Sequence, residues 1–204
     1  VLWAPMRALL HPCAVRAAER CRAAASCGAV LHAGLPQKLR RGITCTMRLV
    51  MQRVTQASVT VDGEVVGQIG RGLLVLVGIT DGDDDAAADW CCRRLLGTRL
   101  WEDDAGKAWA KSVQSAGYEL LLVSQFTLYG VLKGNKPDFH HAMAPGPAKA
   151  YWEALVARVG KAHPAKVAQG RFGAKMAVEL LNDGPVTLTL DSPPPVATAA
   201  TTPP

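Results

Sequence analysis

A polar cluster at the end of a buried strand is the first feature of this sequence that packing alone does not explain. The apolar run Tyr118–Phe126 predicts a buried strand, which leads into the stretch Ser124–Gly130 (S-Q-F-T-L-Y-G). Three hydroxyl groups and one amide at a strand end can offer side-chain and backbone donors to a single ligand. The alternative is an ordinary strand in which Thr127 and Tyr129 face solvent.

A second segment, Asn182–Thr187 (N-D-G-P-V-T), separates two predicted strands, Gly173–Leu181 and Val186–Leu190. Pro185 has no backbone N–H to give to a sheet, so it must lie at a sheet edge or at a bend. Taken alone, N-D-G-P is an ordinary turn, and a purely structural interpretation of it remains open.

The sequence contains no general motif for nucleophilic, nucleotide-binding or zinc-dependent chemistry. His140 and His141 could supply a general base, but neither has an obvious partner nearby in the sequence, which favours solvent-facing loop histidines. The acidic run Asp81–Asp85 lacks the alternating ligands and distal glutamate of a calcium loop, so it is better interpreted as the cap of a helix. We therefore expect no metal and no cofactor.

The elements that must position these segments follow from apolar periodicity and turn residues. An Asp62-Gly63 turn predicts a hairpin, and Trp101–Gly117 predicts a second, polar one. Strands are further expected at 47–54, 57–61, 64–69 and 72–79, helices at 86–96 and 148–159 with Gly97 and Gly160 at their ends, and a long loop at 133–147. Strands outnumber helices, and strands separate the two helices, so the sequence predicts a single compact α+β domain with mixed and antiparallel sheets.

Charge and composition divide the chain into three parts. Residues 1–46 hold seven of the 23 Lys and Arg residues and one of the 17 acids, so the formal charge of +6 belongs to this segment. An Arg-rich, acid-poor segment is typical of an organelle transit peptide, and the alternative is an upstream extension of a chain that starts at Met47. Residues 47–191 form the predicted domain, and the Pro-rich residues 192–204 form a tail that is disordered by composition.

The cysteines and the apolar runs indicate the surroundings of the chain. Four of the six cysteines lie in the first 46 residues at irregular spacing without partnering histidines, which makes a zinc site unfavourable. Cys91 and Cys92 are expected to be free thiols in a reducing compartment. No stretch reaches the roughly 20 apolar residues of a membrane-spanning helix, so we expect no membrane partner. The expected location is the cytoplasm, or a chloroplast or mitochondrion if residues 1–46 are a transit peptide.

Together, in this order and at this distance, the two polar segments resemble the signature sequences S-Q-F-T-L and N-x-G-P-V-T of the D-aminoacyl-tRNA deacylase family. Both occur here without a substitution. The start M-R-L-V-M-Q-R-V, the stretch Lys133–Phe139 and the stretch Arg171–Met176 (R-F-G-A-K-M) also resemble family positions. The resemblance covers residues 47–191, the whole predicted domain.

This resemblance implies a barrel-like core in a homodimer that hydrolyses the ester bond of D-aminoacyl-tRNA, and of glycine mischarged on alanine tRNA. In the family the Gly-Pro bond, here Gly184–Pro185, is cis and enters the partner's site. Its carbonyls accept the substrate's α-ammonium, so an L side chain would collide with this backbone and a D side chain would point to solvent.

The resemblance also assigns the opposite wall of the site to Ser124, Gln125, Phe126 and Thr127. Backbone N–H groups around Phe126 and Thr127 would stabilise the oxyanion formed when water attacks the ester. Thr127 lacks an adjacent base that would make it a nucleophile, which favours assistance by the 2′-hydroxyl of the terminal ribose. Phe172 and Met176 either line a pocket for the terminal adenosine or pack in the core.

Two alternatives remain open at this point. One is a related deacylase that edits an L-amino acid and has its Gly-Pro bond trans. The other is a non-catalytic tRNA-binding module. In each case the partner is the 3′ end of tRNA, and Lys133, Lys136 and Arg171 could supply part of a local basic patch.

Overall fold

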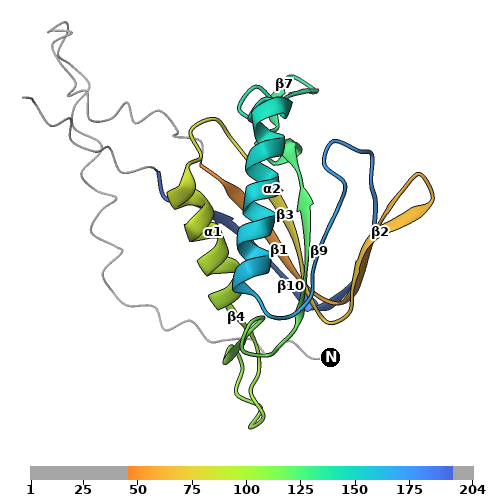
Figure 1. Ribbon diagram of the computed structural model, residues 1–204, viewed down its shortest axis with the longest axis vertical. Coiled ribbons are helices and arrows are strands. Elements are labelled where there is room, and N and C mark those ends of the chain that lie inside the picture. Colours follow the sequence, from red (N-terminus) through yellow and green to blue (C-terminus); the bar gives the residue numbers. More distant parts are fainter. Residues whose placement is uncertain (1–45, 195–204) are drawn as a thin grey trace, which may run out of the picture. The chain divides into compact units, whose positions relative to one another are not determined.

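The computed structural model describes residues 46–194 (Figure 1). The predicted N-terminal segment and most of the predicted tail lie outside the described residues. Among the described residues, no helix is long and apolar enough to span a membrane. The elements in chain order are β1 (Arg48–Val61), β2 (Glu64–Ile69), β3 (Gly72–Gly78), α1 (Asp85–Gly97), β4 (Arg99–Trp101), β5 (Lys111–Ser112), β6 (Glu119–Ser124), the 3₁₀-helix η2 (Phe126–Tyr129), β7 (Val131–Lys133), β8 (Lys136–Asp138), α2 (Pro145–Ala162), β9 (Val167–Gln169) and β10 (Ala177–Asp191).

The main sheet has the strand order β10-β1-β3-β6-β9, with β2 paired to β1. The pairs β3–β6 and β6–β9 are parallel, and the pairs that β1 makes with β2, β3 and β10 are antiparallel. One face of the sheet packs on the helices, and the other curls around a second apolar cluster that includes Val54, Val59, Ile69, Leu74 and Leu121. The predicted α+β fold with mixed sheets and a barrel-like core is thus confirmed.

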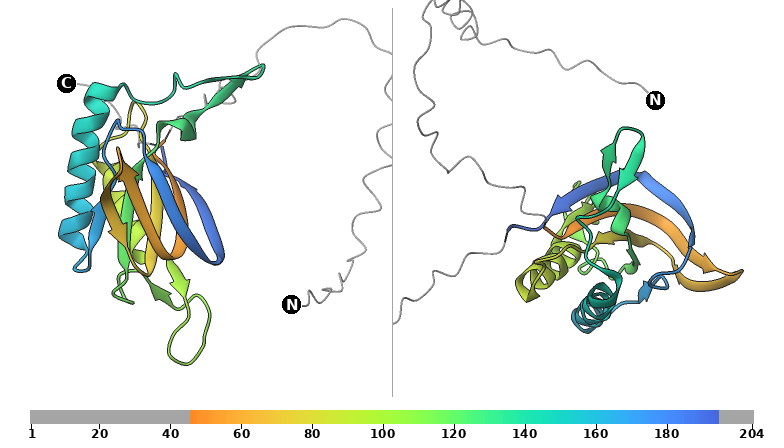
Figure 2. Two further views of the ribbon diagram at one scale, coloured as in Figure 1. Left: turned by 90° about the vertical axis from the view of Figure 1, so that its right-hand side faces the viewer. Right: turned by 90° about the horizontal axis from the view of Figure 1, so that it is seen from above.

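Both helices cover the same face of this sheet (Figures 1 and 2). In α1 the side chain of Asp84 accepts a hydrogen bond from the backbone N–H of Ala87 at 2.9 Å, so the acidic run caps the helix as predicted. In α2 the residues at helical spacing that face the sheet are buried, namely Ala148, Trp152, Leu155 and Val159. This helix continues past Gly160 to Ala162, so the predicted stop at Gly160 is wrong.

Three other boundaries differ from the sequence-based expectation. The strands expected at 47–54 and 57–61 form the single strand β1, because this strand pairs along its length with three neighbours. The expected loop 133–147 contains the β7–β8 hairpin, which turns at Gly134 with φ +62°. Strand β9 carries too few residues for periodicity to reveal it.

The last difference concerns the N-D-G-P segment, which does not end a strand. Gln52 of β1 pairs with Thr187 of β10, and Val54 pairs with Asn182, so residues 183–186 lie opposite Arg53 alone. These residues form a bulge in an edge strand, where a proline costs no ladder hydrogen bond. The prediction that Pro185 lies at an edge or a bend is confirmed.

Asp83, just before α1, should make stability depend on pH. Burial raises its pKa from 3.8 to about 6, against the lowering effect of hydrogen bonds from the backbone of Thr80 and Met47. The folded protein therefore retains a proton that the unfolded chain releases, so the stabilisation is complete below about pH 4 and is lost as the pH rises through about 6.

We expect the substitution Asp83→Asn to remove this dependence. The free energy of unfolding of the variant should rise relative to that of the wild type between pH 4 and pH 7, as measured by urea denaturation. The control is Asp81→Asn at an exposed position. Parallel pH profiles for the wild type and Asp83→Asn would contradict the prediction.

Candidate active site

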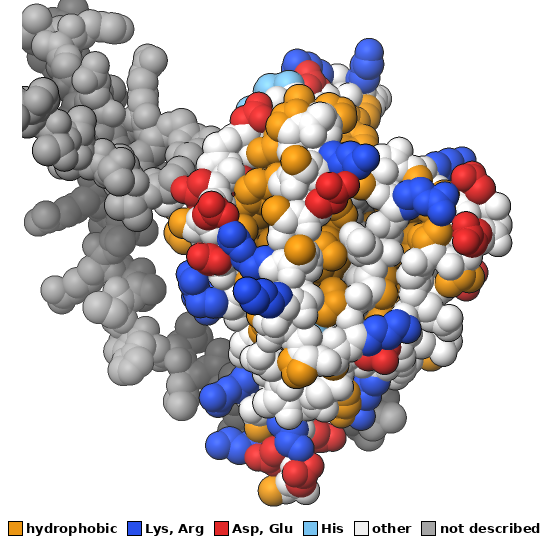
Figure 3. Space-filling view, in the orientation of Figure 1, with side chains coloured by type: hydrophobic (Ala, Val, Ile, Leu, Met, Phe, Trp, Pro, Cys, Tyr) orange, Lys and Arg blue, Asp and Glu red, His pale blue; other side chains and the backbone are white. Residues whose placement is uncertain are grey.

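A cavity of about 520 Å³ opens where β3 and β6 end and α2 begins. Because β3 and β6 are parallel neighbours, their carboxyl ends lie side by side and deliver Val77 and Ser124 to the same wall. Apolar side chains gather along α2 and beside it, whereas charged side chains lie mostly at the periphery (Figure 3). The remaining lining residues are Ile79, Gln125, Phe126, Phe139, Ala142, Met143, Ala144, Pro145, Ala148, Phe172, Gly173, Ala174 and Met176.

Ser124, Gln125 and Phe126 of the first predicted segment line this cavity, whereas Thr127 is not among its lining residues. The strand ends at Ser124 and the chain turns into η2, which sequence reasoning missed. Phe126 is 58% exposed and meets Phe139 edge-on with ring centroids 5.1 Å apart. Thr127 is exposed, as the plain-strand alternative expected. Tyr129 is instead buried, and its hydroxyl donates to the carbonyl of Thr46 at 2.6 Å.

The hydroxyl of Thr127 is not placed beside a base. The side-chain amide of Gln125 donates a hydrogen bond to the Thr127 oxygen, and an amide cannot accept the proton of a nucleophile. The first backbone N–H groups of η2 have no carbonyl partner within the helix. The segment therefore offers donors rather than a nucleophile and its base.

Phe172 and Met176 face the same cavity from the segment between β9 and β10. Both are partly buried and pack against the two apolar clusters, so they serve the cavity wall and the core together. The two readings of these residues, pocket or core, are therefore not exclusive.

Gly184 and Pro185 lie elsewhere in the chain. Both are exposed, the peptide bond between them is cis, and they line a separate hollow of about 450 Å³ with Arg53, Arg71, Leu100, Trp101, Glu102, Ala108, Trp109, Asp183 and Val186. Val54 pairs with both Asn182 and Gly72, so this hollow is near the start of β3, whereas the larger cavity is at its end. Within one chain the two signature segments do not meet.

Residues 50–191 match the family model described as D-Tyr-tRNA(Tyr) deacylase. The chain belongs to this family. The resemblance of the two signature segments is thereby confirmed, and the match spans nearly all the described residues.

Curated relatives of this deacylase-family chain match it over about 150 residues. D-aminoacyl-tRNA deacylase 1 of Bos taurus is 50% identical over 155 residues, which cover 76% of this chain and 74% of the relative. D-aminoacyl-tRNA deacylase of Desulfitobacterium hafniense is 52% identical over 147 residues, which cover 72% of this chain and 97% of the relative. The solved structure of c-Myc DNA Unwinding Element Binding Protein has a TM-score of 0.69 and 48% identity, covering 72% of this chain and 99% of that one.

In this deacylase-family chain Arg53 contacts the segment that contains Gly184 and Pro185, and the sequence suggested no role for it. Its Nε atom donates to the carbonyl oxygen of Asp183 at 3.0 Å, and a terminal nitrogen donates to the carbonyl of Leu100. The Asp183 carboxylate lies between Arg53 at 3.5 Å and Arg71 at 3.6 Å. Arg53 thus holds the residue directly before Gly184, and its place in the start M-R-L-V-M-Q-R-V was the available signal.

His140 and His141 are exposed, as expected, and neither lines the cavity. The expectation that they lack a nearby partner is wrong, because Nδ1 of His140 lies 2.7 Å from Asp138. Asp138 also accepts a hydrogen bond from Lys133, and these contacts hold the pKa of its carboxyl well below its usual range. The imidazole therefore belongs to a surface network beside the cavity. Among the described residues, no group of three or more His, Cys, Asp or Glu side chains could hold a metal ion, and Cys91 and Cys92 are free thiols.

Proposed function

We propose that this chain hydrolyses the ester bond of D-aminoacyl-tRNA, and of glycine mischarged on alanine tRNA, as a chiral proofreading step in translation. It is a hydrolase of the D-aminoacyl-tRNA deacylase kind, as its relatives are named. The observation that carries the proposal is the intact S-Q-F-T segment, whose Ser124, Gln125 and Phe126 line a cavity large enough for a nucleoside.

The cavity takes the terminal adenosine of tRNA against Phe172 and Met176. This places the ester next to Ser124–Thr127, where the backbone N–H groups around Phe126 and Thr127 stabilise the oxyanion. The geometry of Gln125 and Thr127 supports this assignment, because it leaves donors available and provides no base. Activation of the attacking water then falls to the ribose 2′-hydroxyl, while the protein orients the reactants.

Chiral selection comes from a second copy of the chain. Gly184 and Pro185 of one protomer enter the cavity of its partner, where their carbonyls accept the α-ammonium and their backbone excludes an L side chain. Two observations support a dimer of this kind: the motif is exposed in a bulge of the edge strand, and it lies at the opposite end of β3 from the cavity. An antiparallel two-fold arrangement therefore brings each motif to the other chain's cavity.

Parallel hydrolysis assays on D-Tyr-tRNA and L-Tyr-tRNA test the function. Loss of the D ester with the L ester spared is the expected result. Loss of both esters would support the related L-editing deacylase, and failure of a folded dimer to cleave either would support a non-catalytic tRNA-binding module.

We expect tRNA binding to be weak, because only a local basic patch contacts the phosphates, and sensitive to salt, because these contacts are electrostatic. Arg171 precedes the cavity residue Phe172, and its guanidinium forms an exposed ion pair with Glu64 at 3.3 Å. We expect Arg171→Gln to weaken tRNA binding and to reduce the slope of log K against log salt by about 1. The control is Arg93→Gln on the exposed surface of α1. A salt slope equal to that of the wild type would remove Arg171 from the interface.

For location we propose the cytoplasm, with a chloroplast or mitochondrion as the alternative if residues 1–46 act as a transit peptide. A fusion of these residues to a fluorescent protein distinguishes the two by microscopy.

A further inference from the structure

Two segments project from opposite ends of the sheet, on the side away from α2. The hairpin arm is β7–β8 (Val131–Asp138), and the loop arm is the connection 102–110 between β4 and β5. The left view in Figure 2 shows the hairpin arm at the upper end, extending sideways beyond β10, and the loop arm at the lower end, extending below β10. Strand β10 lies between them as an edge strand that is mostly exposed, including Leu180 and Leu181.

The hairpin arm exposes apolar and basic side chains together. Val131 and Leu132 are 41% and 71% exposed. The arm contains two lysines, Lys133 and Lys136, and one acidic residue, Asp138, which forms an ion pair with Lys133. Within residues 46–194, no ion pair involves Lys136. The arm therefore exposes apolar side chains along β7 and carries an excess of positive charge next to its turn, where Lys133 pairs with Lys136 in the ladder.

The loop arm has the complementary composition. It carries Glu102, Asp103 and Asp104 against one lysine, Lys107, and acidic side chains gather at this lower end of the molecule (Figure 3). Trp109 is 58% exposed and holds φ +57°, a backbone conformation that L side chains rarely adopt.

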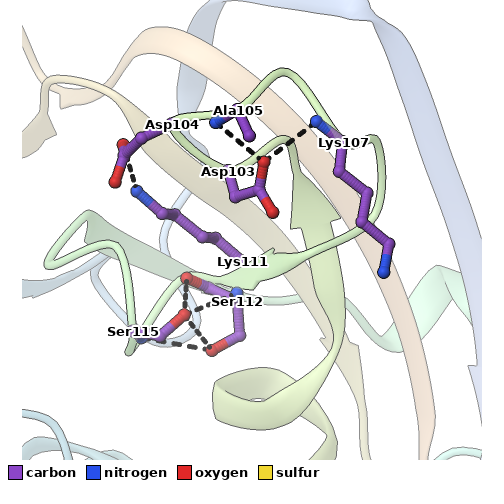
Figure 4. Close-up of polar contacts among 7 residues, drawn as sticks. All are labelled: Asp103, Asp104, Ala105, Lys107, Lys111, Ser112 and Ser115. Carbon is purple, nitrogen blue, oxygen red and sulfur yellow. Dashed lines mark hydrogen bonds and ion pairs between the residues drawn. The ribbon is translucent and has the colours of Figure 1, made fainter.

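Internal contacts give the loop arm a defined shape (Figure 4). Oδ1 of Asp103 accepts hydrogen bonds from the backbone N–H groups of Ala105 at 3.0 Å and Lys107 at 2.9 Å. Asp104 pairs with Lys111 at 2.6 Å. The exposed indole of Trp109 is therefore presented by an ordered loop.

Each arm lies next to one of the two signature segments. The hairpin arm leads directly into Phe139, which lines the large cavity. The loop arm contributes Glu102, Ala108 and Trp109 to the hollow that contains Gly184 and Pro185. When the Gly-Pro motif of one protomer enters the cavity of its partner, the loop arm of the first therefore approaches the hairpin arm of the second.

We propose that each hairpin arm packs on the loop arm of a second copy of this chain, with Leu132 against Trp109 and the lysines facing the acids. Two-fold symmetry makes this contact twice in each dimer. The inference rests on the proposed function, because it uses the dimer that completes the site. The lysines alone would also suit RNA phosphates, but Val131 and Leu132 add exposed aliphatic surface, which the exposed indole of Trp109 from a second copy can cover.

A cysteine pair tests the contact directly in the full chain, with the cysteines at 13, 21, 27 and 45 replaced by serine. The native Cys91 and Cys92 are buried and do not compete. Oxidation of the Leu132→Cys/Trp109→Cys variant should give a covalent dimer on a non-reducing gel, reversed by dithiothreitol. Each single variant and the pair Val65→Cys/Trp109→Cys, in which Val65 is 56% exposed on β2, should stay uncrosslinked.

Charge variants test the same contact without the loss of Trp109. Glu102→Lys and Lys136→Glu should each weaken the dimer several-fold in sedimentation experiments, and the double variant should recover the wild-type affinity. A dimer that forms no disulfide and ignores both charge changes would overturn the contact. So would a Lys136→Glu variant that loses tRNA binding with its dimer affinity unchanged, since RNA would then occupy the arm.

The tests of the arm contact can fail independently of the tests of the proposed function. Selective cleavage of D-Tyr-tRNA by a dimer without arm contacts would leave the proposed function standing and remove this inference alone. A monomeric protein at micromolar concentration would overturn both the arm contact and the proposed completion of the site by a partner.

Discussion

Replacing Gly184 by alanine is expected to lower kcat/KM for D-Tyr-tRNA by about 100-fold or more, because misplacing a positioning group by about 1 Å costs this much. Gly184 has φ +123°, a conformation that strains any other residue. A Cβ at this position would lie 2.9 Å from a terminal nitrogen of Arg53 and 3.1 Å from Cγ2 of Val186. The motif and its anchor must therefore move apart.

The matched control is Gly63→Ala. Gly63 also has a positive φ, +82°, in the β1–β2 turn, but its Cβ would meet no atom within 4 Å. We expect this variant to lose about 1 kcal/mol of stability from backbone strain and to retain hydrolysis. Side-by-side kinetics with both esters provide the measurement. Wild-type kcat/KM and selectivity in a folded Gly184→Ala dimer would contradict the assignment of this backbone to the site.

Replacing Arg53 by methionine is expected to lower kcat/KM for the D ester by roughly 10- to 100-fold through loss of the same positioning. Methionine keeps part of the apolar stem but donates to neither the Asp183 nor the Leu100 carbonyl, and it leaves the Asp183 carboxylate with Arg71 alone. Carbonyls that lose a buried donor cost about 1–3 kcal/mol each in stability. The 183–186 bulge should therefore become mobile.

The selectivity between D and L esters separates positioning from general destabilisation. If Arg53 orients the motif, the ratio of the two kcat/KM values should fall in Arg53→Met. It should be unchanged in Arg158→Met, which breaks the ion pairs with Asp85 and Asp89 away from both signature segments. An unchanged ratio in a folded Arg53→Met protein would show that the bulge holds its conformation without the guanidinium.

Local patterns in the sequence were sufficient for most of the fold. The Asp62-Gly63 turn has φ +52° and +82°, as the dipeptide indicates, because only residues that tolerate a positive φ fit this hairpin. The apolar run at Gly72–Ile79 is a buried strand, and the acids before α1 cap it. The hairpin β7–β8 was not predicted although Gly134-Asn135 is a two-residue turn signal, because its strands have only three residues each and one of them contains Pro137.

The site could be predicted only in part. Two gapless signature segments identified the family, and Phe172 and Met176 do line the cavity with Ser124, Gln125 and Phe126. Arg53, Phe139 and the first turn of α2 were not assigned to a site. Their contribution depends on strand neighbours distant in sequence, and no local pattern encodes such pairing.

The sequence by itself determined the class of fold, the family and the two segments that carry its chemistry, because periodicity, turn residues and ungapped motifs are local properties. Only the tertiary structure decided where those segments lie. Strand β10 returns from the end of the domain to pair with β1, and this places Gly184 beside Arg53, near the start of β3. The parallel pairing of β3 with β6 places Ser124–Phe126 at the other end. The separation of the two segments within one chain is thus a property of strand order, which arises from long-range packing.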